Sequence, residues 1–137
     1  MTGLLVNLDV ADLERAVEFY RRGLDLRPGR RLFDGSVAEM LGASVPIYLI
    51  EYSAGSATSI GSPAARDYGR HWTPVHLDFV VDDVERAVRR ACQAGALLEG
   101  EIQTHTWGRI ATLSDPFGHG FCLLQFLGRG YGEVAES

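Results

Sequence analysis

Two side chains that can do acid–base chemistry, His76 and Asp78, lie two residues apart in the apolar run HLDFVV at 76–81 of this 137-residue chain. Side chains alternate between the two faces of an extended strand, so we expect the imidazole and the carboxylate on the same face. Imidazole titrates near neutrality, and a carboxylate that orients it can make it a general base. His76 or His105 could therefore act as a general base, and Asp78 or Glu51 could be the carboxylate that pairs with His76.

Other side chains can bind a ligand beside this pair. Asn7 stands 71 positions before Asp78, and Trp107 can form an aromatic wall or simply pack in the interior. Arg109 is the arginine that we expect to contact a ligand. His71, His105 and His119 are weaker candidates, and we expect His119 to be an exposed polar residue. The predicted ligand-binding residues are therefore Asn7, Asp78, Trp107 and Arg109.

The elements that position these residues follow from an internal repeat. Residues 10–17 read VADLERAV and residues 81–88 read VDDVERAV, identical at six of eight positions with an offset of 71. In each copy apolar residues recur at i, i+3, i+4 and i+7, which is typical of an amphipathic helix. Asp12 and Asp83 stand at the N-cap positions, and Gly23 and Gly95 stand where left-handed C-caps are expected.

Each predicted helix follows a short strand and precedes three more. The strand before the first helix places Val6, Leu8 and Val10 toward that helix and Asn7 on the other face. Tyr48 could extend the aromatic wall of the ligand site, or it could meet the helix, because it shares a strand face with Ile50. The pattern predicts two small sheets, each covered by one helix, whose polar faces line a shared cleft.

The repeat also predicts the organisation of the chain as one domain built from two modules. Module 1 covers about residues 1–53 and module 2 about residues 73–127. The stretch 54–72 is rich in Gly, Ser, Ala and Pro, which is typical of a linker or a mobile flap. We expect the polar tail at 128–137 to be loosely held.

Composition excludes several classes of function. All 13 basic residues are arginine, so lysine Schiff-base chemistry and a P-loop lysine are absent. The net charge of −5 argues against nucleic-acid binding. No apolar run approaches the ~20 residues of a membrane span, and the first residues do not resemble a signal peptide. We therefore expect a soluble cytoplasmic protein with Cys92 and Cys122 reduced.

Three segments carry a resemblance to a known family. They are VADLERAVEFYRRGLDL, VHLDFVVDDVERAVRRACQAG and WGRIATLSDPFGHGFCLLQF. The chain resembles the vicinal oxygen chelate superfamily, which includes glyoxalase I, bleomycin and fosfomycin resistance proteins, and extradiol dioxygenases. The resemblance covers nearly the whole chain. It implies an α+β fold in which two βαβββ modules form an open cup-shaped mixed sheet of about eight strands, often in a homodimer.

The resemblance also implies where a metal would bind. In the metal-dependent members, ligands come from the first and last strands of each module, and His76 matches one such position. The equivalent position in module 1 is Leu5, which cannot bind a metal. Glu51 is the candidate on the last strand of module 1, and Cys122 stands where glutamate is usual. His76, Glu51 and Cys122 could form a soft zinc site, or Cys122 could be an ordinary core residue.

Three functions remain open. The first is a lyase or dioxygenase that uses His76 and Glu51 with a divalent metal such as Zn, Ni, Mn or Fe. The second is a metal-free protein that binds or sequesters a small, antibiotic-like molecule in the cup. The third is a metal-free acid–base enzyme on the same cup. In each case the expected partners are a small molecule and a second copy of the chain.

Overall fold

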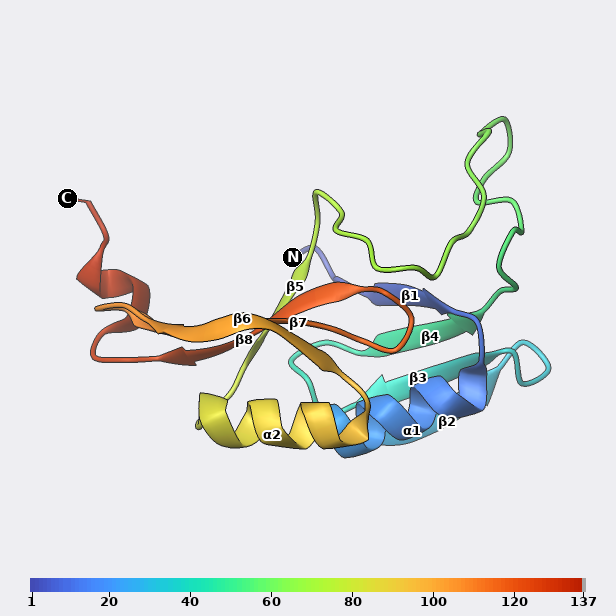
Figure 1. Cartoon of the computed structure of the whole chain (residues 1–137). Coiled ribbons are helices and arrows are strands. Elements are labelled where there is room, and N and C mark those ends of the chain that lie inside the picture. The colour runs from blue at the N-terminus through green and yellow to red at the C-terminus, as the bar shows by residue number, and fades with distance from the viewer. Residues whose placement is uncertain (137) are drawn as a thin grey trace. The chain divides into compact units, whose positions relative to one another are not determined.

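The computed structural model describes residues 1–136, which divide into two compact units, Met1–Gly69 and a second unit that starts at Arg70 (Figure 1). Each unit has one four-stranded sheet and one α-helix packed on it. The succession of strand, helix and three strands occurs twice, so the predicted α+β fold of two βαβββ modules is confirmed.

The first unit is built in the order β1, β4, β3, β2 across its sheet. β1 runs parallel to β4, and the other pairs are antiparallel. The elements are β1 (Val6–Val10), α1 (Leu13–Leu24), β2 (Arg27–Leu32), β3 (Val37–Leu41) and β4 (Ile47–Glu51).

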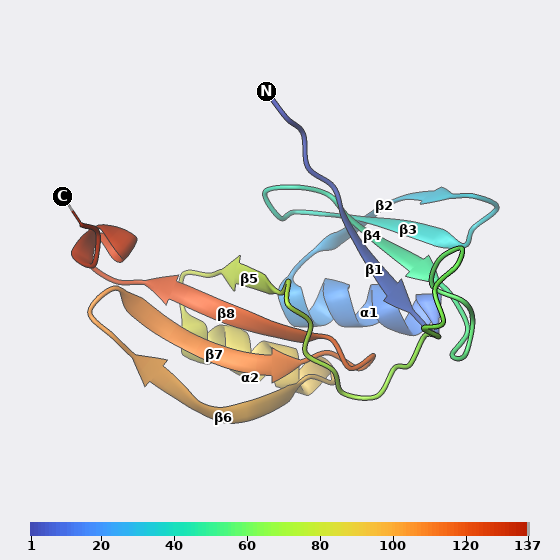
Figure 2. The same cartoon turned by 90° about the horizontal axis from the view of Figure 1, so that it is seen from above.

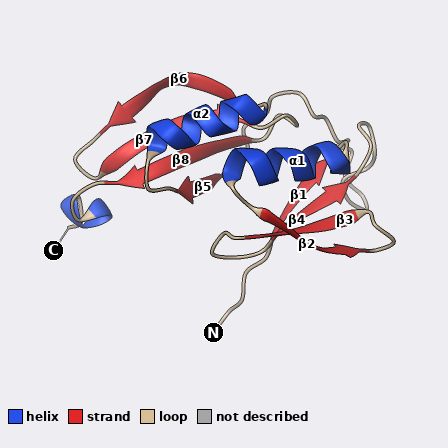
Figure 3. Ribbon diagram, turned by 90° about the horizontal axis from the view of Figure 1, so that it is seen from below, coloured by secondary structure: helices blue, strands red, loops and turns tan. Residues whose placement is uncertain are grey.

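The second unit repeats this topology in the order β5, β8, β7, β6, again with one parallel pair, β5 with β8. Figures 2 and 3 show that each helix covers one face of its own sheet. The elements are β5 (Leu77–Val80), α2 (Val84–Ala94), β6 (Leu97–Thr104), β7 (Gly108–Ser114) and β8 (Gly120–Phe126), followed by the 3-10 helix η1 (Gly130–Glu133). Among the described residues, no helix is long and apolar enough to cross a membrane.

The helix starts confirm the predicted caps, whereas one helix end differs. The side chains of Asp12 and Asp83 accept hydrogen bonds from backbone N–H groups at 3.1 Å. Gly95 ends α2 with φ 122°, as predicted. Gly23 is not a cap, because it is buried within α1, and Asp25 takes the left-handed conformation instead with φ 57°. Aspartate tolerates that region because its short polar side chain can hydrogen-bond locally.

The core of each unit lies between its helix and the facing sheet. In the first unit Phe19 of α1 and Met40 and Leu49 of the sheet are buried. Of the two alternatives for Tyr48, packing on the helix is excluded, because its strand neighbours Ile47 and Leu49 are the residues that turn inward. The hydroxyl of Tyr48 lies on the opposite face, where it binds a carboxylate.

The stretch expected to be a linker is largely a folded loop of the first unit. Gly55 N–H donates to the Arg66 carbonyl at 2.7 Å, and Ala57 pairs with Ala65 in an isolated bridge. The guanidinium of Arg66 binds Asp9 at 2.8 Å and lies 3.7 Å from the centre of the Tyr52 ring. These contacts fix the base of the loop on the sheet.

Candidate metal and ligand site

Four polar side chains form a row across the second sheet, on the face away from α2. Cys122 on β8 is in register with Asp78 on β5 and with Thr112 on β7, and Thr112 is in register with Glu99 on β6. Residues in register on neighbouring strands point to the same face. We call Asp78, Cys122, Thr112 and Glu99 the second polar row.

His76 extends this row and completes a cluster of metal-binding atoms. The His76 Nε2 atom lies 3.2 Å from Asp78 Oδ1. One donor atom each from His76, Asp78 and Cys122 lies within 4.8 Å of the other two. An imidazole, a carboxylate and a thiolate are all ligands of zinc-type cations, and three protein ligands are typical of a catalytic zinc site. The donor set therefore fits a soft divalent cation.

The protonation of Cys122 is coupled to its surroundings. Burial raises the pKa of the Cys122 thiol, Asp78 raises it further, and the contact with Thr112 Oγ1 at 3.6 Å opposes the shift. The thiol is therefore protonated at neutral pH unless a positive charge is added. A bound divalent cation would supply that charge and favour the thiolate.

The segment that leads into β5 packs over this cluster. The Trp72 ring lies 4.6 Å from the ring of His76, centre to centre. Gly120 makes room for Trp72, since a Cβ at that position would lie 2.6 Å from Trp72 Cζ3. Arg70 Nη2 donates to Glu99 Oε1 at 2.7 Å, and this contact links the segment that leads into β5 to the second polar row. The side-chain hydrogen bonds of this pair raise the pKa of Arg70 and lower that of Glu99.

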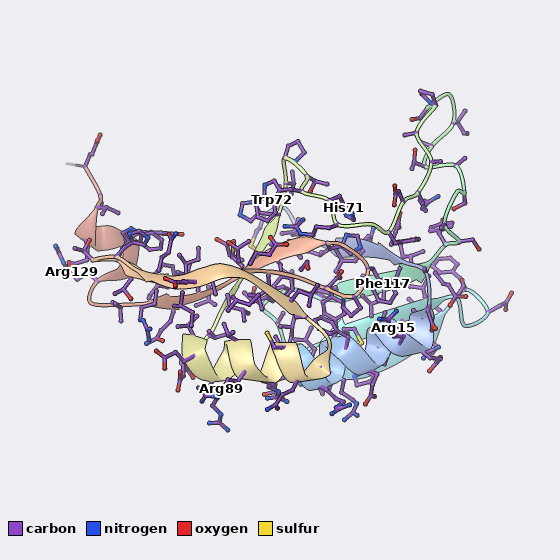
Figure 4. The ribbon with its side chains drawn as sticks, in the orientation of Figure 1. Arg15, His71, Trp72, Arg89, Phe117 and Arg129 are labelled. Carbon is purple, nitrogen blue, oxygen red and sulfur yellow. The ribbon has the colours of Figure 1, made fainter. Side chains whose placement is uncertain are left out.

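Two histidines, His71 of this segment and His119 immediately before β8, are in contact with each other. The Nε2 atom of His71 and the Nδ1 atom of His119 are 2.9 Å apart, and the backbone N–H of His119 donates to the buried Asp115 at 2.9 Å. His119 is therefore half-buried and hydrogen-bonded, so its predicted exposure is wrong. Figure 4 shows His71 and Trp72 on the segment that precedes β5.

The other predicted ligand-binding residues of the second unit lie elsewhere. The Trp107 ring stacks on His105 at 5.0 Å and packs against Tyr131 at 5.5 Å. Arg109 is in register with Gln125 on the helix side of the sheet and binds Glu85 of α2 at 2.7 Å. Neither belongs to the second polar row, and a role for them in ligand binding stays a prediction.

Glu51 of the first unit is turned toward its own helix. Its Oε2 atom accepts a hydrogen bond from the Leu13 N–H at 2.8 Å, at the first residue of α1. Gln125 makes the equivalent contact with the Val84 N–H of α2 at 2.9 Å. This shared role was not predicted from the sequence, although both side chains stand on the last strand of their module. Leu5 is exposed and offers no metal ligand.

The first sheet has a polar row of its own. Tyr48 is in register with Asn7 and with Glu39, and its hydroxyl donates to Glu39 Oε2 at 3.0 Å. Arg30 donates to the same carboxylate from Nε at 3.1 Å and from Nη2 at 2.8 Å. We call Asn7, Tyr48, Glu39 and Arg30 the first polar row. Sequence reasoning missed Glu39, whose one signal is a charge inside the apolar run VAEML.

Two βαβββ modules, each with a polar face opposite its helix, define the class of protein to which this chain belongs, the vicinal oxygen chelate fold. A family model described as a glyoxalase-like domain matches residues 5–124. The chain therefore belongs to the glyoxalase-like domain family.

Comparisons with individual proteins agree with this assignment. The chain is 27% identical to an uncharacterized protein of Mycobacterium tuberculosis over 122 residues, 87% of this chain and 71% of the relative. It is similar to a glyoxalase/bleomycin resistance protein/dioxygenase family enzyme from Burkholderia phytofirmans, with 20% identity, coverage of 90% and 97%, and a TM-score of 0.68. It is also similar to the fosfomycin resistance protein FosX from Listeria monocytogenes, with 21% identity, coverage of 91% and 93%, and a TM-score of 0.67. A FosX variant was solved with Mn(II) and a dihydroxypropylphosphonic acid.

Proposed function

We propose that this protein binds a small molecule over the second polar row, with a divalent cation held by His76, Asp78 and Cys122. The observation that carries the proposal is the convergence of three different donor atoms within 4.8 Å. FosX, which shares the fold, was solved with a bound metal, and this supports the idea that such a cation belongs to the function. When bound, the cation would supply a Lewis acid to an oxygen of the small molecule.

The side chains around the cluster have separate roles in this proposal. Asp78 orients the His76 imidazole through the 3.2 Å contact. Trp72 covers one side of that imidazole, which limits its rotation and shields it from water. Thr112 offers a hydroxyl next to Cys122, where it can hydrogen-bond the sulfur or a bound oxygen.

Metal binding to the purified chain tests the proposal. Protein purified without chelators is analysed for metal and then titrated with Zn²⁺, Co²⁺, Ni²⁺, Mn²⁺ and Fe²⁺. We expect one equivalent of Zn²⁺ or Co²⁺ to bind, and Co²⁺ to give a thiolate charge-transfer band. The variants His76→Ala and Cys122→Ser should each weaken binding, and Cys122→Ser should remove the band. His105→Ala is the matched control, because His105 stacks on Trp107 away from the cluster.

The alternative is a metal-free acid–base site, which the contact of His76 with Asp78 favours. If none of these metals binds the wild-type protein, the metal proposal is wrong and the acid–base alternative takes its place. A role for Glu51 as a further metal ligand stays a prediction, which Zn²⁺ titration of Glu51→Ala tests.

We also propose that the chain forms a homodimer in the cytoplasm. β1 and β2 are the edge strands of the first sheet, and β5 and β6 are those of the second. Exposed edges are usually covered in natural proteins, and pairing of two chains would cover some of them. Cys92 and Cys122 are both free thiols, which suits a reducing compartment. Elution at the monomer mass at micromolar concentration would contradict the dimer.

A further inference from the structure

Arg30 of the first polar row is held rigidly along one edge of its guanidinium. Its Nε and Nη2 atoms both donate to the Glu39 carboxylate, at 3.1 and 2.8 Å, and its backbone N–H donates to Glu39 Oε1 at 3.2 Å. The Tyr48 hydroxyl adds a fourth hydrogen bond to the carboxylate. Hydrogen bonds from Arg30 chiefly hold the pKa of Glu39 down, at about 2, so the carboxylate stays ionised at neutral pH.

The backbone around Arg30 is shaped for this contact. The register of β2 on β3 shifts between Pro28 and Arg31, which places an irregularity in the ladder at Arg30. Such bulges often redirect a side chain. Gly29 leaves space for the carboxylate, since a Cβ there would lie 2.6 Å from Glu39 Oε1. The bulge and Gly29 together therefore allow the close contact between Arg30 and Glu39.

The end-on edge of the same guanidinium, between Nη1 and Nη2, is open. The Arg30 side chain is 70% exposed, and its Nη1 atom has no hydrogen-bond partner among the described residues. Arg66 makes a useful contrast, because its side chain is only 10% exposed and it binds Asp9, Ser56 and the Ala57 carbonyl. Arg66 therefore stabilises a loop, whereas Arg30 presents two N–H donors to solvent.

We propose that Arg30 is the anchor of a binding site for an anionic group with two oxygens, a carboxylate or a phosphate, on the face of the first sheet away from α1. The end-on edge of a guanidinium matches two oxygens on one atom and binds them with parallel hydrogen bonds. Because Glu39 offsets the charge of Arg30, recognition rests on this geometry more than on net charge. The proposal goes beyond the function proposed above and does not depend on metal binding at His76.

Titration of the full chain with simple anions tests the site. Acetate and inorganic phosphate are added to ¹⁵N-labelled protein at constant ionic strength, with chloride as the balancing ion, and the signals of Arg30 and Gly29 are followed by NMR. We expect saturable shifts centred on Arg30 with acetate, phosphate or both, and the comparison identifies the preferred group. Arg30→Lys should weaken binding by about tenfold or more, because lysine lacks the fork.

A matched variant controls for charge. Arg27→Gln removes an exposed positive charge from the same strand. It should leave the affinity within about twofold of wild type, and circular dichroism should show that Arg27→Gln and Arg30→Lys are both folded. The proposal is overturned if the shifts do not saturate, if Arg30→Lys binds as tightly as wild type, or if Arg27→Gln weakens binding as much as Arg30→Lys.

Discussion

The contact between Glu51 and the first residue of α1 gives a prediction that separates a stabilising role from a metal-binding one. Glu51→Ala removes the acceptor of the 2.8 Å hydrogen bond from the Leu13 N–H and leaves the helix N-terminus less satisfied. Hydrogen bonds to charged groups contribute about 1.5–3 kcal/mol, and a carboxylate near a helix N-terminus about 0.3–1 kcal/mol. Because Glu51 is exposed, we discount these values and expect a loss of about 1 kcal/mol.

Glu51→Gln is the matched variant, since glutamine keeps the acceptor and loses only the charge. Gln125 already makes this contact in the second unit, at 2.9 Å. We therefore expect Glu51→Gln to cost less than Glu51→Ala, about 0.5 kcal/mol. Gln125→Ala should cost about 1 kcal/mol.

Urea unfolding followed by circular dichroism measures these differences, and a metal titration of the same variants measures the second role. Glu101→Ala, at an exposed position of β6, is the control. A stabilising role for Glu51 at the start of α1 is refuted if Glu51→Ala has the same unfolding midpoint as Glu101→Ala. Zn²⁺ binding that is weaker in folded Glu51→Ala than in folded Gln125→Ala would support the prediction that Glu51 is a metal ligand.

Three further predictions concern other contacts. Gly120→Ala should displace Trp72, because the new Cβ would lie 2.6 Å from Trp72 Cζ3. We expect the free energy of unfolding in urea to fall by about 1–3 kcal/mol and the fluorescence of Trp72 to change. Unchanged fluorescence would contradict the packing of Trp72 on Gly120. The pKa of Glu39 is lowered to about 2, so the ionised carboxylate stabilises the fold fully above about pH 4.5, and this stabilisation is lost as the pH falls toward 2. Between these pH values, the unfolding midpoint of Glu39→Gln should depend less on pH than that of wild type. An equally steep dependence would argue against the contact with Arg30. Asp83→Ala removes the N-cap of α2 and should lower the free energy of unfolding by about 1 kcal/mol, whereas Asp83→Asn should melt close to wild type. Equal losses of stability in the two variants would exclude a capping role.

Much of the fold could be predicted from the sequence, because its signals are local. The repeat around Asp12 and Asp83, the helical spacing of apolar residues and the alternation in the first strands are each set within a few residues of the chain. These signals gave the order of elements in both units and placed Asn7 and Asp78 at equivalent positions. The predicted C-cap at Gly23 was wrong because Gly23 is a buried residue within α1, and Asp25 is the left-handed residue at which the helix ends.

The candidate site could not be predicted in full, because it depends on contacts between residues that are far apart in the sequence. Asp78 lies near both His76 and Cys122 because the pairing of β5 with β8 places Asp78 in register with Cys122. A shift of one residue in β8 would move the Cys122 side chain to the face that packs on α2. Arg30 and Glu39 are in contact across the β2–β3 hairpin because of a bulge, and the spacing of apolar residues does not predict that bulge. Local patterns along the chain indicate which elements form and which residue types those elements carry. Strand register and side-chain packing, which join residues distant along the chain, decided which of those residues act together.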